Sequence, residues 1–142
     1  MTGSGPRTDL ELADISWSDS LPVSNRFDDV YYSRDNGLAE SRHVFLDGNN
    51  LAQRWAQLAA NDRFTVIETG FGTGLNLLCA VDQWLAIAPP GCRLDYISVE
   101  KYPLAASAMA QALSCWPELG HLTRELLDQY PPPLSGVHRR WL

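Results

Sequence analysis

The 142-residue sequence has no long hydrophobic run and no secretion signal. Its most apolar segment, residues 75–88, is interrupted by Asp82 and Gln83, and it is shorter than the roughly 20 residues that cross a bilayer. The N-terminus lacks both the basic start and the apolar core of a signal peptide. We therefore predict a cytoplasmic protein that does not associate with membranes.

Cysteine is scarce, and the three present (Cys79, Cys92 and Cys115) form no CxxC pair. An odd number of scattered cysteines argues against a disulfide framework and against a zinc site. The three histidines also lack metal-ligand spacing, so we predict no metal site. Cys79 lies in an apolar helical pattern, where a buried thiol is more common than a nucleophile.

Positive charge is also low, because 11 Lys and Arg residues face 17 Asp and Glu residues, giving a net charge of −6. This balance argues against a surface that grips nucleic acid by itself, since such surfaces are usually basic. Hydrophobic residues make up 45% of the chain and aromatic residues 10%, which is the composition of a folded domain.

Gly, Ser, Pro and acidic residues without apolar periodicity predict a flexible arm over residues 1–22. A small extension of strand, turn and helix is predicted over residues 23–60. Two strands are expected at residues 30–32 and 43–46, joined through the turn-forming residues 35–37 into an antiparallel unit. A helix is expected from Leu51, with Asn50 as its cap and Gln53 completing a capping box.

Residues 61–142 alternate strand and helix patterns. A β-branched strand at residues 64–67 precedes a glycine loop at 70–74, a helix with an apolar stripe over 75–88 and a second strand at 94–99. Further helices are expected from Pro103 to Leu113 and over 119–130. This order predicts an α/β fold with parallel strands. Because sheets usually have about 4 to 6 strands, we interpret the chain as the front part of a larger domain with an incomplete sheet.

The glycine loop is the main candidate site. Glu68 ends the first strand, and Gly70, Gly72 and Gly74 follow it before a helix. Glycines here let the backbone turn tightly and approach a ligand, and the helix directs free N–H groups toward it. A dinucleotide site has the spacing GxGxxG, but Leu75 stands where its third glycine would be. The observed GxGxG after an acid favours S-adenosylmethionine, whose ammonium and sulfonium a carboxylate complements.

Glu100 ends the second strand, where an acid can accept hydrogen bonds from both ribose hydroxyls. Strand-end glycines and acids also serve as ordinary turns and helix caps, so this alternative stays open. Tyr31 and Tyr32 alternate, which places one of them toward the ligand cleft or leaves one buried and one exposed.

Six blocks in order resemble one protein family, the methyltransferase domain of the bifunctional MnmC proteins that modify tRNA wobble uridine, also found alone as MnmD. The blocks are FDDVYYS at 27–33, NGL at 36–38, VFL at 44–46 with GN at 48–49, ETGFGTGLN at 68–76, ISVEKYPL at 97–104 and WPEL at 116–119. The likeness extends over about residues 24 to 138.

The resemblance implies a class I, Rossmann-like methyltransferase that transfers methyl from S-adenosylmethionine to 5-aminomethyl-2-thiouridine in tRNA, giving 5-methylaminomethyl-2-thiouridine. Bifunctional members add an FAD-dependent oxidoreductase domain, which these 142 residues lack. By position, the loop residues would hold the methionine part, Glu100 the ribose, and Lys101 would lie beside the adenosine. The implied cofactor-binding residues are Glu68, Gly70, Phe71, Gly72, Gly74, Asn76, Glu100 and Lys101.

One family feature is missing from this sequence. Family members carry a later Leu-Asp-Gly-Phe-type segment whose acid lies next to the amine acceptor, and no Asp-Gly-Phe occurs here. We therefore assign no catalytic residue. The alternatives are a non-catalytic remnant that binds S-adenosylmethionine and a nicotinamide-dependent enzyme.

Overall fold

The computed structural model describes residues 8–33 and 36–142. It contains two separate sheets, one antiparallel with three strands and one parallel with two. The predicted α/β fold class is confirmed. In chain order the elements are β1 (Ile15–Ser18), β2 (Leu21–Ser24), β3 (Asp29–Val30), α1 (Gly37–Glu40), the π-helix η1 (Ser41–Asp47), α2 (Leu51–Ala56), β4 (Arg63–Thr69), α3 (Leu75–Ile87), β5 (Arg93–Val99), α4 (Ala106–Leu113), the 3₁₀ turn η2 (Pro117–Leu119) and α5 (Gly120–Gln129).

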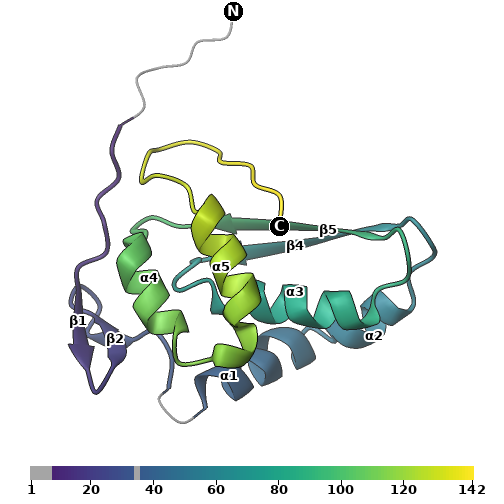
Figure 1. The fold of residues 1–142 in the computed structure, drawn as a ribbon, viewed down its shortest axis with the longest axis horizontal. Helices are drawn as coiled ribbons and strands as arrows, with labels where there is room; N and C mark the ends of the chain where they lie inside the picture. The colour runs from purple at the N-terminus through teal and green to yellow at the C-terminus, as the bar shows by residue number, and fades with distance from the viewer. Residues whose placement is uncertain (1–7, 34–35) are drawn as a thin grey trace, which may run out of the picture.

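The parallel sheet positions the candidate site. Strands β4 and β5 pair in register from Arg63 opposite Arg93 to Thr69 opposite Val99, so both end at the same edge. Helices α2 and α3 lie on one side of the two strands, whereas the C-terminal segment returns along the other side (Figure 1). The glycine loop leaves β4 at the shared carboxyl edge and leads directly into α3.

The two faces of this sheet differ in burial. Residues of β4 alternate, so that Val66 faces the buried helix side and Ile67 faces outward with 72% of its surface exposed. On β5 the outward positions include Ile97 and Val99, which are 50% and 59% exposed. The outward face of the parallel sheet therefore carries an apolar strip formed by Ile67, Ile97 and Val99.

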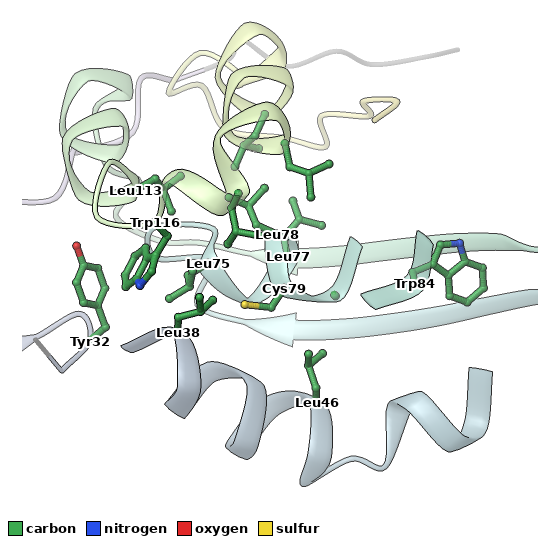
Figure 2. Packing of buried hydrophobic residues seen from close by; sticks show 14 of the residues in the cluster. Tyr32, Leu38, Leu46, Leu75, Leu77, Leu78, Cys79, Trp84, Leu113 and Trp116 are labelled. Carbon is green, nitrogen blue, oxygen red and sulfur yellow. The ribbon is translucent and has the colours of Figure 1, made fainter. Parts of the chain in front are cut away.

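The hydrophobic core fills the space between the parallel sheet and the helices. Leu75, Leu78 and Cys79 project from α3 into this core, and Leu46 joins the core from η1 (Figure 2). The buried Trp55 packs edge-on against Trp84, with ring centroids 5.3 Å apart. Helix α3 lies at the centre of the core, because most of its surface is covered: Leu75, Leu77, Leu78, Cys79, Ala80 and Trp84 are all buried. The apolar stripe predicted for residues 75–88 is confirmed only in part, since Leu85 has 69% of its surface exposed.

The antiparallel unit differs from the sequence-based expectation. The arm predicted over residues 1–22 contains β1 and the first half of β2. These two strands pair with each other, and β3 adds to β2. Residues 1–7 lie outside the described part of the chain. The hairpin at 15–24 was missed because its turn residues, Asp19 and Ser20, adopt positive φ without a glycine. The domain bounds themselves remain predictions.

The strand predicted at residues 43–46 is wrong, because this segment belongs to the π-helix η1. Leu46 and Ser41 are buried, whereas Val44 is exposed. Packing of Leu46 against the core stabilises the helix and overrides the local preference of Val44 and Phe45 for strand. The turn expected at 35–37 lies partly outside the described residues, and α1 begins at Gly37 instead.

Two helix starts also differ from the expectation. Asn50 precedes α2 in a left-handed conformation with φ of 53°, and its amide donates to the side chain of Gln53 instead of capping a backbone N–H. The helix predicted from Pro103 to Leu113 is α4, which begins only at Ala106. Among the described residues, no helix is long and apolar enough to cross a membrane.

Candidate functional site

The glycine loop turns sharply between β4 and α3. Gly70, Gly72 and Gly74 all have positive φ, at 83°, 56° and 79°. The Gly70 N–H donates to the carbonyl oxygen of Val99 at 2.8 Å, which ties the loop to the end of β5. A Cβ at Gly70 would meet open space, so the backbone there is bare. The loop thus exposes main chain at the carboxyl edge of the sheet, as a ligand-binding loop requires.

Gly74 serves packing as well as the turn. A Cβ on it would lie 2.9 Å from Leu126 Cδ2 and 3.0 Å from Phe71 Cζ, and its φ of 79° disfavours any side chain. We expect Gly74→Ala to destabilise the chain by about 1–3 kcal/mol because strain and overpacking add. Urea unfolding followed by circular dichroism measures this loss. Gly120→Ala is the matched control, because a Cβ there meets nothing within 4 Å; equal stability of both variants would contradict the prediction.

Glu68 is a buried carboxylate with two partners. Only 7% of its surface is exposed. Its Oε1 accepts a hydrogen bond from Asn76 Nδ2 at 2.9 Å, and its Oε2 accepts one from Ser98 Oγ at 2.9 Å. The Ser41 hydroxyl donates in turn to Asn76 Oδ1. Burial, followed by the negative charge of Glu68, raises the pKa of Tyr96. Glu68 is therefore held directly by side chains from α3 and β5, whereas Ser41 of η1 reaches it only through Asn76.

Glu100 contacts the backbone of the loop directly. Its Oε2 accepts a hydrogen bond from the Gly72 N–H at 3.0 Å, and its Oε1 accepts one from the Tyr102 N–H at 2.9 Å. The structure thus brings both strand-end acids to the glycine loop, as the sequence predicted. Each carboxylate oxygen has a second acceptor position, so both acids can accept further hydrogen bonds from a ligand.

Three aromatic side chains surround the Gly72 side of the loop. The Tyr31 ring lies 3.6 Å from the position that a Cβ on Gly72 would take. Phe71 stacks on Tyr130, with centroids 6.4 Å apart and planes 24° apart. Burial and the Glu100 charge raise the pKa of Tyr31, and burial followed by Glu100 raises the pKa of Tyr130 to about 12. Both tyrosines are therefore neutral donors near physiological pH.

The remaining sequence candidates separate into near and distant residues. Of the tyrosine pair, Tyr31 faces the loop, whereas Tyr32 is buried against Trp116 with centroids 4.6 Å apart (Figure 2). Lys101 is exposed, with its Nζ 5.2 Å from the centre of the Tyr102 ring. Sequence reasoning missed Ser41 and Ser98. Ser98 was recognisable, because it shares the inward face of β5 and lies opposite Glu68 in the parallel register.

Other parts of the described chain offer weaker sites. No group of three potential metal ligands occurs among the described residues. A cavity of about 450 Å³ lies apart from the glycine loop, and its lining residues are Asn36, Gly37, Leu38, Ala39, Arg42, His43, Asp47, Trp116 and Glu118. Of its two basic side chains, Arg42 pairs with Asp82 at 3.7 Å, and His43 Nδ1 lies 3.7 Å from a carboxylate oxygen of Asp47.

The chemistry of the loop follows from its charges. Two carboxylates flank it, and the lone lysine of the chain lies beside the second. Two negative charges near a bare backbone favour a ligand with cationic and hydroxyl groups and disfavour a pyrophosphate. A helix N-terminus by itself would favour an anion, but the nearer full charges of the acids dominate its partial charge.

Comparison with solved structures identifies a protein with a similar fold. The chain matches the crystal structure of MNMC2 from Aquifex Aeolicus with a TM-score of 0.54 and 18% identity, over 92% of this chain and 39% of that one. The chain is therefore an α/β protein that shares its fold with part of MNMC2.

Sequence comparison identifies the relatives. Proteins named tRNA 5-methylaminomethyl-2-thiouridine biosynthesis bifunctional protein MnmC match from Marinobacter nauticus (50% identity, 92% of this chain, 21% of the relative), Marinomonas sp. (50%, 92% and 19%) and Acinetobacter baylyi (52%, 84% and 19%). No protein-family model matches the chain. The resemblance seen in the motifs is confirmed: this chain is related to the MnmC proteins and spans about one fifth of their length.

Proposed function

We propose that the chain forms the S-adenosylmethionine-binding part of a tRNA methyltransferase. The observation that carries this proposal is the placement of two strand-end carboxylates, Glu68 and Glu100, beside a glycine loop with bare backbone. The relatives' name supports 5-methylaminomethyl-2-thiouridine in tRNA as the product, formed from 5-aminomethyl-2-thiouridine. Such a substrate implies a cytoplasmic protein, and the FAD-dependent oxidoreductase of the bifunctional proteins is its implied partner.

The residues of the loop fit this ligand. Glu68 faces the cationic methionine end of the ligand, and Asn76 holds the Glu68 carboxylate in place. Glu100 accepts hydrogen bonds from the ribose hydroxyls, and Lys101 lies beside the adenosine. Gly70 and Gly72 leave room along the main chain, since a Cβ at either meets nothing closer than 3.6 Å. Bound S-adenosylmethionine supplies an electrophilic methyl group whose sulfonium is already a good leaving group.

The acceptor amine sets a further requirement. An alkyl ammonium has a pKa of about 10.4 and no free lone pair, so a base or a dry site must favour its neutral form. In the family this task falls to the acid of a later Leu-Asp-Gly-Phe-type segment, and this sequence contains no Asp-Gly-Phe. We therefore assign no catalytic base to this chain and propose binding without methyl transfer for the isolated 142 residues.

Calorimetric titration with S-adenosylmethionine tests the proposal. We expect saturable binding, weakened about tenfold in Glu100→Ala because two hydrogen bonds to the ribose are lost. Asp95→Ala is the matched control, because the substitution removes the same charge. Asp95 lies on β5, the strand that ends just before Glu100, and it pairs with Arg63 and Arg93 near the start of the two strands. No binding by the wild-type chain, or equal weakening in both variants, would overturn the proposal.

Two other functions predict different results, one in the same titration and one in a methyl-transfer assay. A nicotinamide-dependent enzyme would bind NADH and ignore S-adenosylmethionine; Leu75 in place of the third glycine speaks against it. A catalytically competent chain would transfer methyl to undermodified tRNA without any other polypeptide. Methyl transfer by the purified chain would contradict the assignment of binding alone.

A further inference from the structure

We infer that Ser41 is a positioning residue that, together with Ser98, orients Asn76 and Glu68 toward the methionine end of S-adenosylmethionine. This inference rests on the proposed function, because it assigns roles within that same site. The Ser41 hydroxyl donates to Asn76, and the Ser98 hydroxyl donates to Glu68. Both act through hydrogen bonds to residues that do face the ligand.

The hydrogen bonds fix the direction of the Asn76 amide. The Ser41 hydroxyl donates to Asn76 Oδ1, so Nδ2 points the other way and donates to Glu68 Oε1 at 2.9 Å. The reversed amide would place Oδ1 against the carboxylate, where two acceptors repel each other. Without the Ser41 donor, only the Glu68 carboxylate itself would keep Asn76 Oδ1 turned away.

Ser98 fixes the second oxygen of the carboxylate. Its hydroxyl donates to Glu68 Oε2 at 2.9 Å from the neighbouring strand. Two donors on opposite oxygens hold the carboxylate plane, and each oxygen keeps one acceptor position for a ligand. Because 93% of the Glu68 surface is covered, its charge is weakly screened and its direction matters for a cationic ligand.

Ser41 links a distant part of the chain to this site. It is the first residue of η1 and lies 35 residues before Asn76 in the sequence. Its side chain is buried beside α3, where Arg42 also pairs with Asp82. π-Helical turns are rare in proteins, and they occur frequently at functional sites. Here the π-helix presents the Ser41 hydroxyl to the start of α3.

The test separates the two ends of the ligand. Wild type, Ser41→Ala and Ser41→Thr are titrated with S-adenosylmethionine and with 5′-methylthioadenosine, which lacks the amino-acid part. We expect Ser41→Ala to weaken S-adenosylmethionine binding about five- to tenfold, the loss of one hydrogen bond acting through Glu68. Binding of 5′-methylthioadenosine should change by less than about twofold, and Ser41→Thr, which keeps the hydroxyl, should restore affinity.

A second variant protects the test against misfolding. Ser98→Ala removes the donor to the other oxygen and should give the same ligand-selective loss, whereas Ser114→Ala, an exposed serine that donates only to Gln111 O, should bind like wild type. The inference alone is overturned if Ser41→Ala and Ser98→Ala lose the same affinity for both ligands, or if neither of these two variants loses affinity for S-adenosylmethionine. Failure of the wild-type chain to bind either ligand overturns the proposed function and this inference together.

Discussion

Glu68→Gln is expected to weaken S-adenosylmethionine binding by about 10- to 100-fold, because a charge-assisted hydrogen bond contributes about 1.5–3 kcal/mol. The substitution keeps the shape of the side chain and removes its charge. Glutamine also fits the surrounding donors, since its Oε1 can accept from Asn76 while the Ser98 hydroxyl rotates to accept from its Nε2. The loss of affinity would therefore reflect the missing charge and not a disordered site.

Calorimetry on Glu68→Gln and on Glu125→Gln separates the local charge from the overall charge. Glu125 is exposed on α5, and its substitution changes the net charge from −6 by the same amount. The control should bind like wild type. Binding of Glu68→Gln within about twofold of wild type would show that Glu68 supports only the fold, because a charged hydrogen bond is worth more than that.

Trp55→Ala is expected to have the largest effect on stability. Trp55 is fully buried and packs edge-on against Trp84 at 5.3 Å and Phe64 at 6.0 Å. Deleting a buried tryptophan costs about 3–5 kcal/mol through lost burial and the cavity left behind. Domains are stable by only about 5–15 kcal/mol, so urea unfolding should show a marginal or unfolded variant.

Trp55→Phe is the control for this substitution. The Trp55 Nε1 has no hydrogen-bond partner among the described residues, so phenylalanine removes volume but breaks no hydrogen bond. It should cost clearly less than alanine while keeping an aromatic edge on Trp84. A loss below about 1 kcal/mol for Trp55→Ala would contradict the assignment of Trp55 to the centre of the core.

The glycine loop and its two acids could be predicted because the information is local. A β-branched strand, an acid, three glycines and an amphipathic helix follow one another within residues 64–88, and parallel strands bring their ends together. Ser41 could not be predicted as a neighbour of Asn76, since their contact depends on how η1 packs against α3. The short run at 43–46 carries both strand-forming residues and helical spacing, and only tertiary packing decides between them.

The apolar strip of Ile67, Ile97 and Val99 bears on how samples of this chain are handled. In the described chain β4 pairs only with β5, so the strip lies between two open strand edges. The unpaired N–H and C=O groups of such edges can pair with a strand of another molecule. The net charge of −6 opposes such self-association by mutual repulsion, and added salt screens that repulsion. Dilute protein at low ionic strength is therefore the condition in which its ligand titrations report on single molecules.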